Sequence, residues 1–141
     1  MCLSSRTRPV PAGAKSTYPS LDKEANREAV YLAVSQNNGC NYCVSAHTML
    51  AKRAGMSDEQ ILAIRKFQPQ SDKLRALVKF VLRVMETKGF VDDADVAAVR
   101  KAGYSDGQIA ESVAYIGLAT YSNLFNHVFN TPLDFPEAPK L

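Results

Sequence analysis

The chain has 141 residues, enough for one domain with a buried core, and its 46% hydrophobic and 22% charged residues are ordinary for a globular protein. A net charge of +3 is too small to argue for a nucleic acid partner, and no apolar run reaches the roughly 18 residues of a membrane span. The first 20 residues lack the apolar core of a secretory signal, and three cysteines are too few for a disulfide scaffold, so we expect a cytoplasmic protein.

The first 20 residues carry Pro9, Pro11 and Pro19 among small and polar residues, which predicts an extended arm that packs on a neighbouring subunit. From residue 21 onward the apolar residues recur at helical spacing, and no long stretch alternates with the period of two that a strand requires. The sequence therefore predicts an arm over residues 1–20 and one all-α domain over residues 21–141, a bundle of about six helices.

Capping residues and helix-ending residues mark where each expected helix begins and ends. Ser57, with Gln60 three residues later, has the pattern of a capping box, and Gly55 and Gly89 are placed to end helices. The expected helices cover residues 22–36, 41–54, 58–66, 72–88, 93 or 94–102 and 106–130, with Ser57, Ser71, Asp92 or Asp93, and Ser105 as N-caps.

The segment from Cys40 to His47 is the most informative part of the chain. It places Cys40 and Cys43 three residues apart, with His47 four residues after the second cysteine. Residues 37–39 before it form a helix-breaking Asn-Asn-Gly turn, so the CxxC lies where a loop leads into a helix N-terminus. Unpaired N–H groups and the helix dipole at such a place favour a thiolate. The pattern therefore favours redox or nucleophilic chemistry over a structural role.

Glu28 lies twelve residues before Cys40, on the preceding expected helix. A helical hairpin would bring its carboxylate beside the first turns of the helix that carries the CxxC. One thiolate can then attack a peroxide oxygen or a disulfide sulfur, and the second thiol resolves the sulfenic acid or mixed disulfide. His47 can accept or relay the thiol proton, and Glu28 can orient the imidazole.

A zinc-binding module is the alternative, because Cys40, Cys43 and His47 are zinc ligands and C-x2-C is half of a common zinc motif. Against it, no second CxxC or H-x3-H pair is present, and the other histidine, His127, lies far along the chain. In a third interpretation the cysteines are buried and unreactive in a scaffold kept for assembly. Under the redox interpretation we expect neither a cofactor nor a metal.

These residues carry a resemblance. Glu28, Cys40, Cys43 and His47 follow the pattern E-x11-C-x2-C-x3-H, and within their surrounding sequence they resemble the AhpD-like branch of the carboxymuconolactone decarboxylase family. The resemblance covers roughly residues 21–137, because the second half of the chain is also similar to the C-terminal helices of that family. The decarboxylase branch lacks the CxxC, so the chain resembles the thiol peroxidase branch.

The resemblance implies an AhpD-like all-α subunit, assembled as a trimer or hexamer, with weak alkyl hydroperoxide reductase activity in antioxidant defence. It implies a thiol or a lipoylated protein as reductant. By position, Cys43 would be the attacking thiol and Cys40 the resolving thiol, with His47 and Glu28 as the proton relay. Where AhpD-like proteins carry a relay histidine just before the second cysteine, this chain has Tyr42. A neutral phenol is no base near pH 7, so the relay here must be shorter or use water.

His127 lies in a polar stretch of the last expected helix, which is unusual for a helix expected to pack centrally. Two interpretations are open: it lines the thiol pocket together with Tyr42, or it is a helix-face histidine with a hydrogen bond. Tyr115 and Tyr121 on the same helix are expected to be core aromatics first and pocket-lining residues second.

Overall fold

The computed structural model describes residue 21 and residues 24–141, so the arm expected over residues 1–20 lies outside the described part. Within the described residues there are helices and no strand, which confirms the all-α prediction. The helices are α1 (Glu24–Asn37), α2 (Asn41–Arg53), α3 (Asp58–Arg65), α4 (Asp72–Thr87), α5 (Asp93–Lys101) and α6 (Asp106–Val128). Each of the expected helices is present, with ends that differ by a few residues at most.

Local side-chain caps account for where these helices begin. Ser57 before α3 and Ser105 before α6 each form a capping box, in which the backbone N–H of the serine donates to the side-chain oxygen of Gln60 or Gln108. Asp92, rather than Asp93, is the N-cap of α5. Because these signals act within four residues, the sequence alone was enough to predict them.

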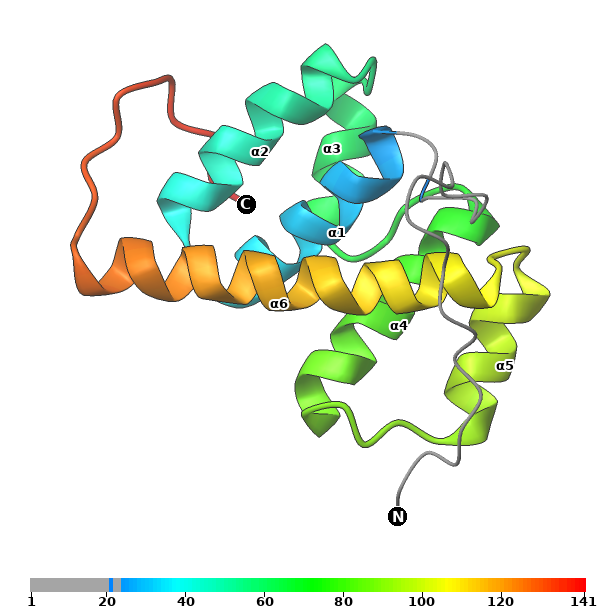
Figure 1. Cartoon of the computed structure of the whole chain (residues 1–141). Coiled ribbons are helices and arrows are strands. Elements are labelled where there is room, and N and C mark those ends of the chain that lie inside the picture. Colours follow the sequence, from blue (N-terminus) through cyan, green and yellow to red (C-terminus); the bar gives the residue numbers. More distant parts are fainter. Residues whose placement is uncertain (1–20, 22–23) are drawn as a thin grey trace, which may run out of the picture.

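Helix α1 lies at the centre of the molecule and contacts α2, α3, α4 and α6 (Figure 1). A helix surrounded in this way should be apolar on most of its sides. Its buried residues are Ala29, Val30, Leu32, Ala33, Val34 and Ser35. Helix α6 runs across α1, α2 and α4, and α5 packs against α4.

A short turn joins α1 to α2 and folds the two helices into a hairpin. Gly39 has a φ of +68°, a left-handed conformation that glycine adopts without strain. The backbone N–H of Cys40 donates to the carbonyl of Ser35 at 3.0 Å, which fixes the position of the next helix. After α6 the chain returns along α2, where the N–H of Ala138 donates to Ser45 Oγ at 2.9 Å (Figure 1).

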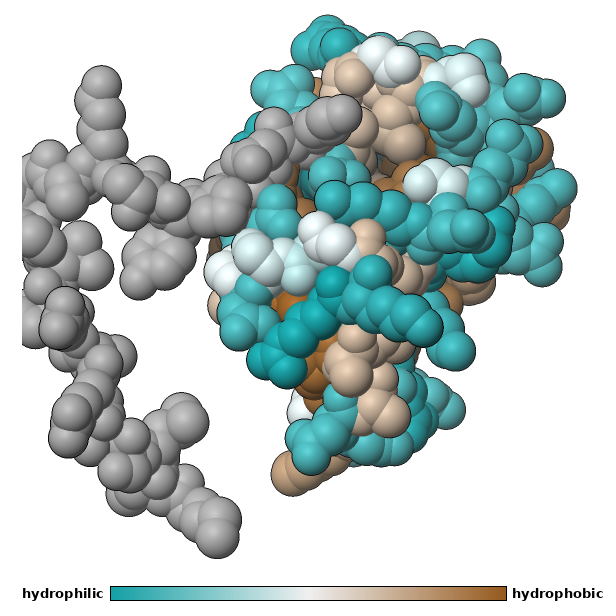
Figure 2. All heavy atoms as spheres, turned by 90° about the vertical axis from the view of Figure 1, so that its right-hand side faces the viewer, coloured by the Kyte–Doolittle hydropathy of each residue, from teal (hydrophilic) through white to brown (hydrophobic). Residues whose placement is uncertain are grey.

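The surface is polar on the side where α5 lies, with hydrophobic atoms showing between hydrophilic side chains (Figure 2). Helix α6 is different, because it exposes large apolar side chains toward its C-terminal end. This α6 stripe consists of Leu118, Tyr121, Leu124, Phe125 and Val128, each of them 47% to 74% exposed. No helix of the described residues is long and apolar enough to cross a membrane.

Candidate active site

The two cysteines of the CxxC begin helix α2 and are joined by a disulfide, with their Cα atoms 5.3 Å apart. Cys40 is the N-cap of the helix, and its Sγ accepts a hydrogen bond from the backbone N–H of Cys43 at 3.3 Å. Both residues are nearly inaccessible, Cys40 being 1% exposed and Cys43 2% exposed. The chain thus forms an oxidised dithiol couple at a helix N-terminus, shielded from bulk water.

A residue from α6 contacts the second sulfur. Asn126 Nδ2 donates to Cys43 Sγ at 3.3 Å and to the carbonyl of Ser122 at 2.9 Å, so its amide is held in place by its own helix. Each sulfur of the couple therefore accepts one N–H hydrogen bond. An N–H donor stabilises a thiolate more than a thiol, so both donors favour the ionised form when the couple is reduced.

The structure brings Glu28 of α1 and His47 of α2 into direct contact. Glu28 Oε2 lies 2.8 Å from His47 Nδ1, and both side chains are mostly buried, 14% and 16% exposed. When the carboxylate is ionised it can only accept, so Nδ1 carries the hydrogen and Nε2 keeps a lone pair for another proton. Among the described residues no hydrogen bond links His47 to either sulfur. A proton that passes between His47 and the couple therefore needs a bridging water.

Tyr31 is a residue of this site that the sequence reasoning missed. Its ring stacks on His47 with centroids 4.3 Å apart and an interplanar angle of 3°. Burial, with smaller contributions from Tyr115 and Glu28, raises the pKa of Tyr31, so its ring stays a neutral phenol. The stacking fixes the imidazole plane. The signal that could have revealed it is position, since Tyr31 follows Glu28 by three residues on one face of α1.

Two cavities reach the site from different sides. One, of ≈ 370 Å³, is lined by Cys40, Tyr42, Asn126 and His127 among others, so α2 and the end of α6 meet there. The second, of ≈ 340 Å³, adjoins Glu28 and Tyr31. Cys43 lines neither cavity.

The remaining sequence-predicted residues have these positions. His127 is exposed and lines the same cavity as Tyr42, whose ring packs edge-on against Phe135 at 4.9 Å between centroids. Tyr115 is partly buried against the core, as expected. The prediction of Tyr121 as a core aromatic is wrong, because Tyr121 is 69% exposed and belongs to the α6 stripe. Apolar periodicity shows which face of a helix is hydrophobic, but not what covers that face.

In the part of the chain that the structure describes, the side chains do not form the ligand set that the zinc alternative requires. There, no group of three or more histidine, cysteine, aspartate and glutamate side chains is close enough together to hold a metal ion. Cys40 and Cys43 are joined by the disulfide, and His47 is hydrogen-bonded to Glu28.

Part of the chain is similar in sequence to known proteins. The family model of the carboxymuconolactone decarboxylase family matches residues 13–69. The alkyl hydroperoxide reductase AhpD of Mycobacteroides abscessus is 35% identical over 69 residues, which are 49% of this chain and 35% of that protein. The match therefore spans about a third of the relative's length.

Solved structures show the same fold at low sequence identity. A protein of unknown function from Agrobacterium tumefaciens, provisionally described as the antioxidant defence protein AhpD, superposes with a TM-score of 0.69 at 23% identity over 79% of this chain and 78% of its own. A variant of the debrominase Bmp8, solved in complex with 2,3,4-tribromopyrrole, superposes with a TM-score of 0.67 at 19% identity over 78% of this chain and 60% of its own. These likenesses show the fold alone.

The six-helix fold has a CxxC at the start of α2 and a carboxylate–imidazole pair across the α1–α2 hairpin, and in fold it is AhpD-like. Over part of its length the chain is similar to proteins of the carboxymuconolactone decarboxylase family.

Proposed function

We propose that this protein is a thiol-dependent oxidoreductase of antioxidant defence, which reduces alkyl hydroperoxides or exchanges disulfides through the Cys40–Cys43 couple. The observation that carries the proposal is the couple itself, at a helix N-terminus with one N–H donor for each sulfur. The Glu28–His47 pair on the same hairpin supports it, and so does the similarity to an alkyl hydroperoxide reductase.

In the peroxide reaction the Cys43 thiolate attacks the terminal peroxide oxygen. The O–O bond breaks, Cys43 becomes a sulfenic acid, and the alkoxide leaves as an alcohol after taking one proton. Cys40 then attacks Cys43 Sγ, the S–O bond breaks, and water leaves as the disulfide forms. Asn126 donates to the sulfur that carries the negative charge at the start of this sequence.

The protons of these steps pass through His47. Its Nε2 takes the thiol proton through a bridging water and returns it to the departing oxygen, while Glu28 holds Nδ1–H and stabilises the imidazolium. Tyr42 takes no part as a base.

A dithiol reductant closes the cycle, either a small dithiol or a lipoyl-type protein. Its thiolate attacks Cys40 Sγ, which is the sulfur of the couple whose residue lines a cavity, and Cys43 leaves as a thiolate. The second thiol of the reductant then attacks the mixed disulfide and frees Cys40. Because the couple must be reduced again after each turnover, we propose that the protein works in the reducing cytoplasm.

The first prediction concerns the couple. One equivalent of cumene hydroperoxide, added to reduced protein, should remove two hydrogens from the peptide that contains Cys40 and Cys43, as read by mass spectrometry. A Cys2→Ser background leaves this pair as the only thiols of the chain. In that background Cys43→Ser should abolish peroxide consumption, and Cys40→Ser should stop at a sulfenic acid that dimedone traps on Cys43.

Two results would contradict the proposal. Full peroxide turnover by Cys43→Ser would remove the couple from the reaction, and a trapped sulfenic acid on Cys40 in that variant would reverse the two roles. Stoichiometric zinc in protein purified without chelator, together with thiols silent toward peroxide, would favour the metal module instead.

We further propose that the α6 stripe packs against another copy of this chain, in a trimer or hexamer. A contiguous apolar patch of this kind marks an interaction surface on a soluble protein. Leu124→Glu should lower the mass measured by light scattering toward the 15.4 kDa of one chain, because a charge would be buried in the interface. Phe90→Glu is the matched control, since Phe90 is 88% exposed and lies outside α6. An equal mass for the wild type and Leu124→Glu would contradict this assembly.

A further inference from the structure

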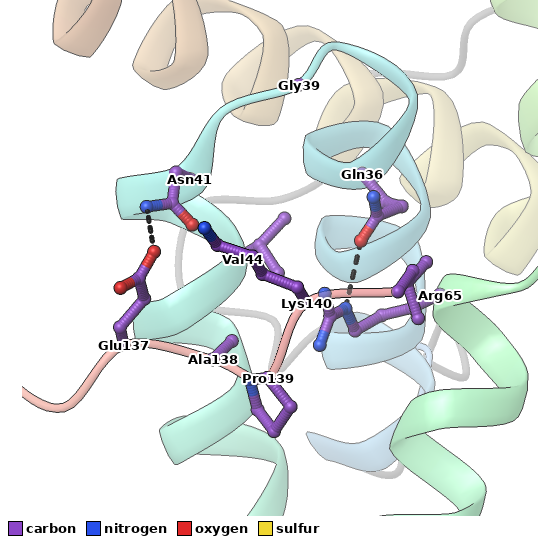
Figure 3. A pocket seen from close by; sticks show the side chains of 10 residues that line it. Gln36, Gly39, Asn41, Val44, Arg65, Glu137, Ala138, Pro139 and Lys140 are labelled. Atoms are coloured by element: carbon purple, nitrogen blue, oxygen red, sulfur yellow. Dashed lines mark hydrogen bonds between the residues drawn. The ribbon is translucent and has the colours of Figure 1, made fainter.

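A third cavity, of ≈ 430 Å³, lies beneath the C-terminal segment, between that segment, the end of α1, the start of α2 and the end of α3 (Figure 3). Its apolar lining includes Val44, Ala138 and Pro139. Its polar lining includes Gln36, Asn41, Arg65, Glu137 and Lys140. Neither Cys40 nor Cys43 lines it, and it shares only Gly39 and Asn41 with the cavity beside Cys40.

Arg65 is the unusual member of this lining. It is only 5% exposed, and its single hydrogen bond runs from Nε to Gln36 Oε1 at 2.9 Å. No carboxylate of the described residues pairs with it. Figure 3 shows its side chain reaching from the end of α3 toward Gln36 and the C-terminal segment. Burial lowers the pKa of Arg65, yet a guanidinium keeps its charge in a protein. A buried charge without a counter-ion is costly, and most buried guanidinium groups are paired.

The other charges around the cavity define which counter-ion fits. Lys140 adds a second positive charge, and the N-terminus of α2 at Asn41 presents the positive end of a helix dipole. Glu137 opposes them, but its Oε1 is already held by Asn41 Nδ2 at 2.8 Å. Among the side chains that line the cavity, two are cations and one is an anion, and this excess of one positive charge suits a monoanion better than a dianion.

We propose that this cavity binds a small organic monocarboxylate, with Arg65 as its counter-ion. The planar guanidinium matches a carboxylate through two parallel hydrogen bonds, and Val44, Ala138 and Pro139 offer an apolar wall for the rest of the molecule. The site does not depend on the proposed redox function, and its occupancy is measured without peroxide.

Sodium benzoate is the probe, measured by isothermal titration calorimetry with wild-type protein, and benzamide is its neutral isostere. Benzoate should bind saturably, and benzamide should bind at least tenfold more weakly. Arg65→Met should lose benzoate binding at least tenfold, whereas Arg53→Met, the same change at an exposed arginine, should retain it. Inorganic phosphate should bind more weakly than benzoate.

Gln36→Glu gives a second and sharper test, because it places a carboxylate where Arg65 Nε already donates. This variant should bind benzoate at least tenfold more weakly and melt at a higher temperature than the wild type, since the counter-ion is now internal. It remains informative even if Arg65→Met fails to fold. Unchanged benzoate affinity in Gln36→Glu, equal affinity for benzamide, or tighter binding of phosphate than of benzoate would overturn the proposal.

Discussion

Replacing Glu28 with glutamine should slow oxidation of the reduced couple by hydroperoxide about 100-fold, the scale typical of acid–base assistance. The amide can still accept the hydrogen bond from His47 Nδ1, whose partner oxygen lies at 2.8 Å in the wild type. It carries no charge, so it cannot stabilise the imidazolium that forms when Nε2 takes the thiol proton. Stopped-flow measurement of disulfide formation under excess peroxide gives the rate.

The pair can be tested as a unit. His47→Gln should lose about as much rate as Glu28→Gln, and the double variant should lose little more, because two groups that act together are not additive. Glu24→Gln is the matched control, since Glu24 lies on the same helix with a side chain 72% exposed. Independent, multiplying losses in the double variant would refute a relay through the two residues.

The second large effect is structural. Asn123 of α6 is 1% exposed and bridges the end of α1 and the turn that follows it. Its Oδ1 accepts from Asn38 Nδ2 at 2.9 Å, and its Nδ2 donates to Ser35 Oγ at 3.1 Å. Asn123→Ala removes both hydrogen bonds and leaves a small void, so the free energy of unfolding should fall by about 2–4 kcal/mol. Urea denaturation followed by circular dichroism measures this loss.

The comparison for this variant is Asn26→Ala. Asn26 is a half-buried asparagine on α1 whose side chain makes no hydrogen bond to any of the described residues. It should cost well under 1 kcal/mol, because no buried partner loses its hydrogen bond. If the two variants were equally stable, the contact between α6 and the α1–α2 turn would contribute nothing measurable. That turn precedes Cys40, so a loosened turn should also make the disulfide easier to reduce.

The accuracy of the sequence-based predictions follows the distance along the chain over which each interaction acts. The caps at Ser57 and Ser105 involve neighbours three residues away, and both were predicted. Glu28 and His47 are nineteen residues apart across one hairpin, and a simple topological argument predicted that they would approach each other. Their roles in a reaction stay a prediction.

Interactions between distant segments could not be predicted in this way. Asn126 and Cys43 are 83 residues apart, and nothing local to either one indicates that the amide meets the sulfur. Arg65 ends a short helix with an ordinary charged pattern, and it lines one cavity together with a C-terminal segment whose position no periodicity predicts. Tyr121 shows the complementary failure, because the pattern that marks an apolar helix face is the same whether that face is buried in the core or exposed.

Because the disulfide is buried, the rate at which the couple exchanges with other thiols is not set by its reduction potential alone. With Cys40 and Cys43 only 1% and 2% exposed, a bulky thiol such as glutathione has little access to either sulfur, whatever the potential difference. A redox titration in glutathione buffer should therefore approach equilibrium slowly, and early readings should give an apparent potential that drifts with time. A slender dithiol that fits the cavity beside Cys40 should reach the same end point much sooner. The fold thus insulates this couple kinetically from the general thiol pool and leaves it to a reductant of matching shape.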